Sequence, residues 1–414
     1  MDTQHTKRVT ALIALTYFFI LLSYPLVRSS SSALFYEYYT ADDYSFATFI
    51  GVIVLMVFIG VSNFLQNRIG IQKLYLGTGI VSIGMLGISY LGLQAGIKEF
   101  AYALFATKES YIVVLVHMCL AYANAYYPLD QLKKLIGPIG AVGSIGGIVG
   151  GQLTSFLATS MGTEAVFTVS LTLIFTSSLI FYFTQGVFIA GLNQNKLSLT
   201  PLRAVQDVKK YVFLIGLVVA LSQFVIYIAD LQFNMIFEKV VTTKDARASY
   251  LGDFYSIINF VSLFLQFVVL PFLLTRVELR SIFIFIPGLY FLLVIGGFSF
   301  GATSLIAISS VFIAMKGTDY SLFAATKDVM YHPLLSLQKF GAKYITDMFV
   351  YRTAKAIIAF IMAQFTIIEM GLITTLQFLF LGVWILGVIA LFEEQKKLNK
   401  KVTDQNIIQK RKET

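Results

Sequence analysis

Long apolar segments recur along the whole chain, and they restrict its fold more than any other feature. A helix needs about 20 largely apolar residues to cross the hydrocarbon core of a bilayer. Only 13% of the residues are charged while 57% are hydrophobic, so polar residues are too few to cover a water-exposed surface. We therefore predict an all-α integral membrane protein with twelve transmembrane helices. The twelve segments are 9–28, 44–65, 75–94, 109–127, 136–159, 164–184, 211–231, 251–273, 281–299, 302–323, 344–366 and 371–392.

The distribution of Lys and Arg predicts the orientation of these helices. With the N-terminus inside, the inner loops carry most of the basic residues, and the outer loops, which include Lys98, Lys108 and Lys244, also contain acids. Lys and Arg collect in cytoplasmic loops, so we predict a multi-pass protein of the bacterial inner membrane with both termini cytoplasmic. Residues 393–414 are strongly basic, and we interpret them as a tail beside an anionic leaflet rather than a nucleic-acid-binding segment.

Two loops of the first half resemble the equivalent loops of the second half. Residues 64–69 (Phe-Leu-Gln-Asn-Arg-Ile) match 272–277 (Phe-Leu-Leu-Thr-Arg-Val), and 126–134 match 331–339, each offset by about half the chain. Parallel repeats of six helices are the arrangement of the major facilitator superfamily, in which the solute binds near the midplane between the halves. The predicted division is a first bundle in 1–185, a cytoplasmic linker in 186–210, a second bundle in 211–392 and the tail in 393–414.

The tenth segment holds the most informative polar residues, because ionisable groups inside a membrane span are costly and usually functional. Lys316 lies three residues before Asp319 and four before Tyr320, so on a helix all three share one face. Two interpretations are open. Lys316 and Asp319 form an internal ion pair that only holds helices together, or Lys316 faces a cavity and binds an anion while Asp319 balances charge or carries a coupling proton.

The eleventh segment repeats this pattern. Lys343, Asp347, Tyr351 and Lys355 follow at intervals of four, with Arg352 beside them, and this spacing predicts one stripe along a helix. The first of these lysines is expected in solvent at the helix end, whereas Lys355 lies deeper. A cavity that contains Arg352, Lys355 and the lysine of the tenth segment suits a phosphate or carboxylate. Asp347 is a further candidate for charge balance.

Two more ionisable residues lie near predicted span ends. Arg28 follows Tyr24 and Pro25, and it either snorkels to the outer interface or lines an outer vestibule and meets an anionic solute. Asp230, near the end of the seventh segment, is either an exposed acid at a helix end or a partner for a cation or proton in the central cavity.

The glycine-rich segment 137–151 is interpreted as a packing surface. Its small residues recur at spacings of three and four, which is typical of close helix packing in membranes and is expected at a seam between moving helices. It has no Gly-x4-Gly-Lys-[Ser/Thr] motif and no preceding strand, so a phosphate-binding loop is excluded. The histidines (His5, His117 and His332) are far apart, and no His/Cys metal set or nucleophile elbow is present. We therefore expect no enzyme activity, no cofactor and no metal site.

Three parts of the chain resemble the bacterial and plastid ATP/ADP translocases, a family of nucleotide transporters. Residues 24–28 (Tyr-Pro-Leu-Val-Arg) are similar to their Tyr-x-x-x-Arg opening, and 121–151 is similar to their fourth and fifth spans. Residues 316–323 (Lys-Gly-Thr-Asp-Tyr-Ser-Leu-Phe) and 327–334 resemble their most specific signature, with Asp328 in place of a Glu. The resemblance implies the major facilitator fold and candidate anion contacts at Arg28, Lys316, Tyr320 and Lys327.

The chain also departs from translocases that exchange ATP for ADP. Residues 29–32 are four serines where those proteins carry a lysine, and Ala125 stands where an acid is usual. Residues 230–233 and 252–255 look more like uncharacterised bacterial relatives of the family.

The predicted function is therefore a secondary transporter or antiporter that moves an anionic small solute, such as a nucleotide or another phosphorylated metabolite, by alternating access. The alternatives are transport of a metal cation, a lipid or a drug, and a non-transporting membrane scaffold.

Overall fold

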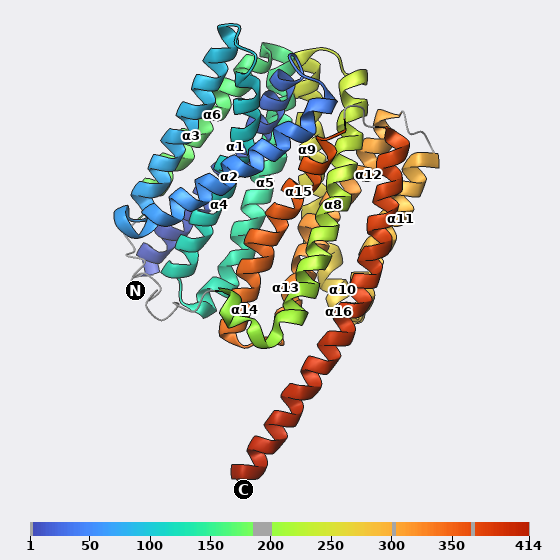
Figure 1. The fold of residues 1–414 in the computed structure, drawn as a ribbon. Coiled ribbons are helices and arrows are strands. Elements are labelled where there is room, and N and C mark those ends of the chain that lie inside the picture. The colour runs from blue at the N-terminus through green and yellow to red at the C-terminus, as the bar shows by residue number, and fades with distance from the viewer. Residues whose placement is uncertain (1–2, 185–200, 300–303, 366–368, 414) are drawn as a thin grey trace. The chain divides into compact units, whose positions relative to one another are not determined.

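A computed structural model gives the fold for residues 3–184, 201–299, 304–365 and 369–413, which are helical almost throughout and contain no strand. The prediction of an all-α protein is confirmed. Three short segments, Leu265–Val269, Asp319–Phe323 and Tyr344–Val350, are π-helical, and Gln206–Val208 is a 3₁₀ turn. The helices are α1 (Thr3–Phe35), α2 (Ala41–Ile69), α3 (Ile71–Gln94), α4 (Phe100–Tyr126), α5 (Leu129–Met161), α6 (Thr163–Tyr182), α7 (Pro201–Ala204), η1 (Gln206–Val208), α8 (Lys209–Val240), α9 (Lys244–Phe264), η2 (Leu265–Val269), α10 (Leu270–Arg276), α11 (Leu279–Ser299), α12 (Leu305–Thr318), η3 (Asp319–Phe323), α13 (Ala324–Met330), α14 (Ser336–Lys343), η4 (Tyr344–Val350), α15 (Tyr351–Met362) and α16 (Met370–Glu413) (Figure 1).

Ten helical segments of the described chain are long and apolar enough to cross a membrane. They coincide with ten of the twelve predicted spans. The other two predicted spans fall on α12–η3–α13 and on α14–η4–α15, where charged side chains lower the hydropathy. The count of twelve spans therefore stays a prediction.

Single glycines make two of the connections between helices. Gly70 separates α2 from α3 and has φ 79° and ψ 152°, and Gly162 separates α5 from α6 with φ 88° and ψ 168°. This backbone region is essentially restricted to glycine. A one-residue connection between consecutive helices is possible at these positions because no Cβ is present.

The chain divides into two compact units. Unit 1 comprises residues 1–193 and 234–263, and unit 2 comprises residues 194–233 and 264–414. Residues 234–263 belong to unit 1 although they follow the midpoint of the sequence, because they pack against first-half helices. The division into two six-helix bundles stays a prediction. Of the predicted linker 186–210, residues 186–200 lie outside the part of the chain that the structure describes.

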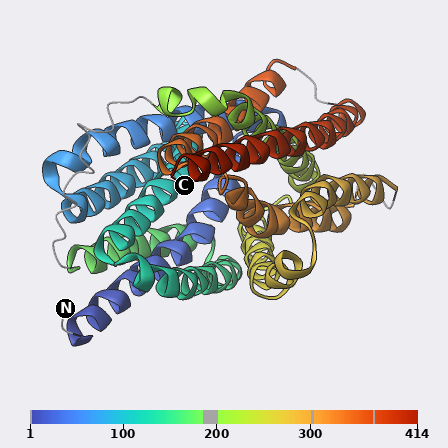
Figure 2. The same ribbon diagram turned by 90° about the horizontal axis from the view of Figure 1, so that it is seen from below.

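In unit 1, α1 lies against α4, α5 and α6, and α4 also contacts α2 and α3 (Figure 2). Glycine permits the closest of these approaches. A Cβ on Gly146 would lie 2.5 Å from the carbonyl oxygen of Phe18, and a Cβ on Gly150 would lie 2.3 Å from that of Leu22. No side chain fits at such distances, so the predicted packing role of the glycine-rich segment is confirmed at the α1–α5 contact.

In unit 2, aromatic rings and buried hydrogen bonds join α11, α12 and α16. The ring of Trp384 lies 5.6 Å from the rings of Tyr290 and Phe323. The Tyr290 hydroxyl donates to the carbonyl oxygen of Met315 at 2.7 Å. Buried polar groups are normally satisfied in this way, and the result is a fixed frame beside the charged residues of α12 and η3.

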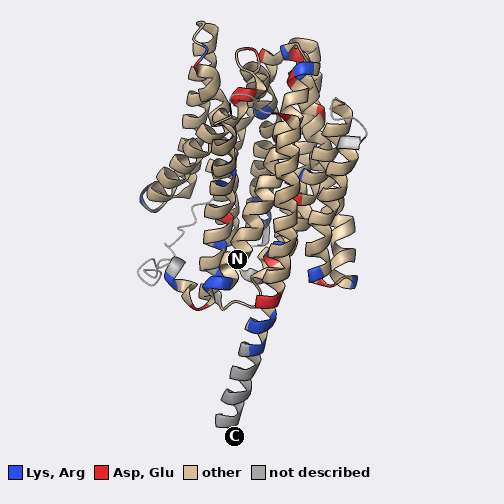
Figure 3. Ribbon diagram, turned by 45° about the vertical axis from the view of Figure 1, so that its right-hand side comes forward, with Lys and Arg blue, Asp and Glu red and all other residues tan. Residues whose placement is uncertain are grey.

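Charged residues are sparse along the middle of the helices and more frequent near helix ends (Figure 3). This distribution is expected where hydrocarbon surrounds the middle of each helix, because an ionised group there is costly. The few charges that do lie within helices are therefore informative. Most of the predicted basic tail, 393–413, continues α16 as a helix.

Candidate functional site

A buried charge cluster lies at the junction of α12 and η3 in unit 2. Lys316 Nζ lies 3.5 Å from Asp319 Oδ2, and their side chains are 11% and 3% exposed. The ammonium group also lies 4.8 Å from the centroid of the Tyr320 ring, within the range of a cation–π interaction. The two side chains are therefore paired, which both interpretations of the sequence allow, and their role stays a prediction. Asp319 is the first residue of a π-helical turn, a feature that is frequent at functional sites.

Residues from two other helices of unit 2 surround this cluster. Asp230 of α8 and Tyr351 of α15 both interact electrostatically with Lys316, and Tyr351 also interacts with Arg352. Asp230 is 6% exposed, and α8 continues ten residues beyond it to Val240. The alternative of an exposed acid at a helix end is therefore wrong for Asp230.

Lys355 lies one turn beyond Tyr351 on the same face of α15, about 6 Å further along the axis. It is partly buried, and no hydrogen bond or ion pair joins it to any residue that the structure describes. The predicted stripe of four residues is interrupted, because η4 separates Lys343 from Lys355 and a π-helix places more residues in each turn. Within α15 the spacing of Tyr351 and Lys355 still holds.

A second set of ion pairs joins α13 to the segment that follows it. Lys327 lies 2.8 Å from Asp347 in η4, and Lys343 lies 2.9 Å from Asp328. The Tyr331 hydroxyl donates to Asp347 Oδ1 at 3.0 Å. Burial and the nearby Asp347 carboxylate raise the pKa of Tyr331 above its ordinary value, so this phenol stays protonated as a donor. Lys327, predicted as an anion contact, thus has an internal carboxylate partner.

Unit 1 holds a separate cluster around Arg28. Arg28 Nε lies 3.2 Å from Glu109 Oε1, and Tyr24 donates to Glu109 Oε2 at 2.9 Å. The guanidinium carbon lies 4.4 Å from the ring centroid of Tyr255 in α9. Arg28 does not end its helix, since α1 continues to Phe35, and its side chain is only 10% exposed. The snorkelling alternative therefore does not describe Arg28.

The four serines after Arg28 are buried, and the last of them contacts a lysine that was predicted in an outer loop. Lys108 is 4% exposed within α4, and its ammonium group donates to Ser32 Oγ at 2.8 Å. The outer-loop prediction is wrong for Lys108, because α4 begins at Phe100, nine residues before the predicted span. Sequence reasoning also missed Glu109, although a glutamate inside an apolar segment was a usable signal.

The backbones of α5 and α9 touch in unit 1. A Cβ on Gly151 would lie 2.5 Å from the carbonyl oxygen of Gly252, and a Cβ on Gly252 would lie 2.7 Å from that of Gly151. Ser155 donates to Asp253 Oδ2 at 3.0 Å, and Ser256 donates to the carbonyl oxygen of Ile148 at 3.0 Å. We call this contact the α5–α9 seam, and it joins a helix of the first half of the sequence to one of the second half.

Polar contacts continue this seam at the helix ends that were predicted to lie outside. Lys244 pairs with Glu164, and Asp245 accepts the backbone N–H of Thr163 at 2.7 Å. Arg247 donates to three carbonyl oxygens, including that of Tyr36 at 2.6 Å. At this end of unit 1, segments from both halves of the sequence are therefore held together.

Comparison with solved structures identifies the fold. The chain superposes on the crystal structure of a mutant of the nucleoside transporter NupG with a TM-score of 0.71 and 12% identity, covering 93% of this chain and 99% of that one. The chain has the major facilitator fold. It also superposes on a bacterial homologue of the iron transporter ferroportin in its inward-facing state, with a TM-score of 0.65 and 13% identity, covering 94% of this chain and 98% of that one. A D-xylose–proton symporter superposes with a TM-score of 0.65 and 11% identity, and 94% of this chain and 97% of that one are covered.

These neighbours with the major facilitator fold are membrane transporters and not enzymes. No protein-family model and no curated protein sequence matches the chain. Among the residues that the structure describes, no group of three or more His, Cys, Asp or Glu side chains is arranged to hold a metal ion.

Proposed function

We propose that the chain is a secondary transporter or exchanger of an anionic small solute in a bacterial inner membrane. The neighbours with the same fold support transport, since their names describe transporters of nucleosides, iron and xylose. The resemblance of 316–323 to the nucleotide translocases favours a nucleotide or another phosphorylated metabolite. An ion gradient or counter-exchange supplies the energy.

The choice of an anion depends on one observation, the surplus positive charge of Lys355. Asp230 and Asp319 both interact with Lys316, and Asp347 pairs with another lysine. Lys316, Arg352 and Lys355 together carry three positive charges against the two negative charges of Asp230 and Asp319, so the set has one positive charge in excess. Lys355 has no such partner among the described residues, and a phosphate or carboxylate oxygen would supply it.

We assign the solute contacts in unit 2 to Lys316, Tyr320, Arg352 and Lys355, with Asp230 and Asp319 balancing charge. In unit 1, Arg28 is a further candidate contact, and its guanidinium group is positioned by the ion pair with Glu109 and the cation–π contact with Tyr255. Lys327 and Asp347 are assigned to an ion pair that joins helices.

The α5–α9 seam and the polar contacts beside it are assigned to a closed outer gate. Backbone contact at Gly151 and Gly252 allows close packing, while the hydrogen bonds of Ser155 and Ser256 are few enough to break during each cycle. Alternating access requires that such a seam open while the inner end closes.

Thermal unfolding of the purified protein tests the proposed solute. The ligands are ATP, ADP, inorganic phosphate, dicarboxylates and divalent metal ions, and the variants are Lys355→Ala and the matched control Lys355→Arg. A ligand at 100 times its Kd stabilises the native state by about 2.7 kcal/mol. We expect nucleotides to raise the midpoint for the wild type and for Lys355→Arg, and not for Lys355→Ala.

The double variant Lys316→Ala/Asp319→Ala tests the rest of the site without leaving one buried charge unpaired. We expect it to fold and to lose the nucleotide shift. A shift with divalent metals alone, or a nucleotide shift that survives both Lys355→Ala and the double variant, would overturn the anion site. Exchange of labelled nucleotide into liposomes then measures transport itself.

A further inference from the structure

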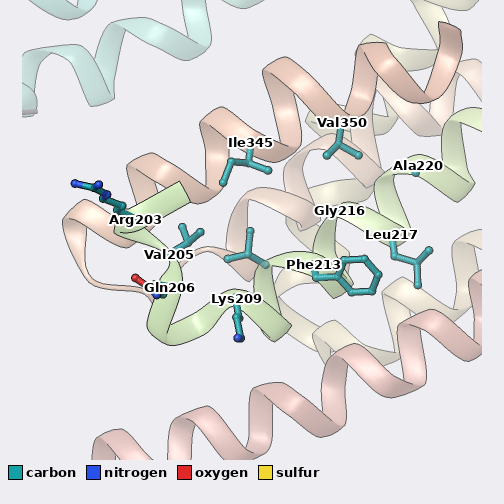
Figure 4. A pocket seen from close by; sticks show the side chains of 11 residues that line it. Arg203, Val205, Gln206, Lys209, Phe213, Gly216, Leu217, Ala220, Ile345 and Val350 are labelled. Atoms are coloured by element: carbon teal, nitrogen blue, oxygen red, sulfur yellow. The ribbon is translucent and has the colours of Figure 1, made fainter. Parts of the chain in front are cut away.

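A pocket of about 730 Å³ lies in unit 2 beside the first turns of α8. Its walls come from α7, η1, α8 and η4, and they include none of the residues assigned to the solute (Figure 4). Sites for small molecules generally have volumes of about 300–1,000 Å³. The pocket is therefore large enough for a ligand and separate from the proposed solute site.

The lining of this pocket is polar at one end only. Arg203, Gln206 and Lys209 lie at the end near α7 and η1, and the wall beyond them is apolar and includes Phe213 and Leu217 (Figure 4). No acidic side chain is among the eleven that line the pocket. This arrangement fits a ligand with an anionic head and an apolar tail.

The direction of the pocket agrees with such a ligand. From Lys209 to Ala220 the wall follows α8 for about 16 Å, and the basic end is the one predicted to lie at the cytoplasmic interface. Phe213 is 66% exposed, so an apolar ring borders the opening. An amphiphile placed here has its head at the inner membrane surface and its tail along the helix.

We propose that this pocket binds an anionic phospholipid of the inner leaflet. Arg203 and Lys209 bind the phosphate, because basic side chains at this interface attract anionic lipids. One acyl chain lies between α8 and Val350 of η4, and so it stabilises the packing of α8 against the π-helical segment. The site does not depend on the identity of the transported solute.

Native mass spectrometry with phosphatidylglycerol and phosphatidylcholine tests the proposal. We expect tighter binding of phosphatidylglycerol to the wild type, and about 30-fold weaker binding to the double variant Arg203→Ala/Lys209→Ala, because each basic residue near an anionic surface contributes about a fivefold effect. Lys134→Ala, which removes an exposed cation elsewhere, is the matched control and is expected to bind as the wild type does.

The variant Gly216→Leu tests the apolar part of the pocket. A Cβ on Gly216 meets nothing closer than Val350 Cγ2 at 3.6 Å, so there is room for a side chain to begin here, and we expect the longer side chain of leucine to enter the pocket that Gly216 lines. We expect this variant to fold and to lose the rise in unfolding midpoint that phosphatidylglycerol gives the wild type. Equal binding of the two lipids, an unchanged lipid effect in Gly216→Leu, or an equal effect of soluble glycerol phosphate would overturn the proposal.

Discussion

Alanine at Gly252 tests whether the α5–α9 seam is a closed gate. The new Cβ would lie 2.7 Å from the carbonyl oxygen of Gly151 and 2.8 Å from the backbone nitrogen of Ser155. Backbone atoms cannot move away by a change of rotamer, so the clash can be relieved only if α5 and α9 move apart. Overpacking of this kind costs about 1–3 kcal/mol, and because an open seam does not contain the clash, the ratio of open to closed molecules rises about 5- to 150-fold.

Labelling of a cysteine at the seam measures this ratio. Ser256→Cys is the reporter, because Ser256 is 3% exposed, and Cys119→Ala removes the only native cysteine. A membrane-impermeant maleimide added outside intact cells is expected to label the reporter faster in Gly252→Ala than in the same reporter protein with Gly252 intact. Gly140→Ala, in the helix α5 that packs against Gly252 but with nothing within 4 Å of its Cβ, is the matched control.

A second variant with a milder clash shows whether the labelling rate follows the size of the clash rather than misfolding. A Cβ on Gly147 meets the end of the Asn259 side chain at 2.8 Å, and a side chain can move, so Gly147→Ala is expected to give an intermediate labelling rate. Each variant must elute as one monodisperse peak. Equal labelling rates in Gly252→Ala and Gly140→Ala would refute the assignment of the seam to a gate.

Three further predictions concern the polar contacts. Arg28→Gln is expected to lower the free energy of unfolding by about 3–5 kcal/mol because it leaves Glu109 without its guanidinium partner. The double variant Arg28→Leu/Glu109→Leu is expected to lose less of this free energy. Equal losses of the two variants in thermal unfolding would contradict this expectation. Lys327→Asp is expected to destabilise the protein and the charge reversal Lys327→Asp/Asp347→Lys to restore part of the loss, so a double variant no more stable than the single one would argue against the ion pair. Arg247→Gln removes hydrogen bonds to three carbonyl oxygens and is expected to speed labelling at the seam, whereas an unchanged rate would place Arg247 outside the gate.

The apolar segments predicted the helices well, because length and hydropathy alone decide whether a segment can span a membrane. The charges in the second half of the sequence were also informative. Lys316 and Asp319 are paired as their spacing predicted, since residues three apart meet on any helix. Their role in binding a solute stays a prediction.

The partners of Arg28 could not be predicted in the same way. Glu109 and Tyr255 lie 81 and 227 residues further along the chain, and no local periodicity connects them to α1. The position of Lys108 was predicted wrongly because the predicted span began after the lysine, at Glu109, although the residues before the lysine are also largely apolar. The real helix begins earlier and buries the lysine against Ser32.

The π-helical turn of η4 makes the length of this segment as important as its composition. A π turn holds an additional residue, and one residue in an α-helix corresponds to about 100° of rotation. Deletion of a single residue within Tyr344–Val350 would restore the regular α-helical register. Every side chain from Tyr351 onward, Lys355 included, would then rotate by that angle about the axis, although no functional residue had been replaced. Homologous proteins that conserve this lysine are therefore expected to conserve the spacing between it and Lys343, and an insertion or deletion here would mark a change of solute.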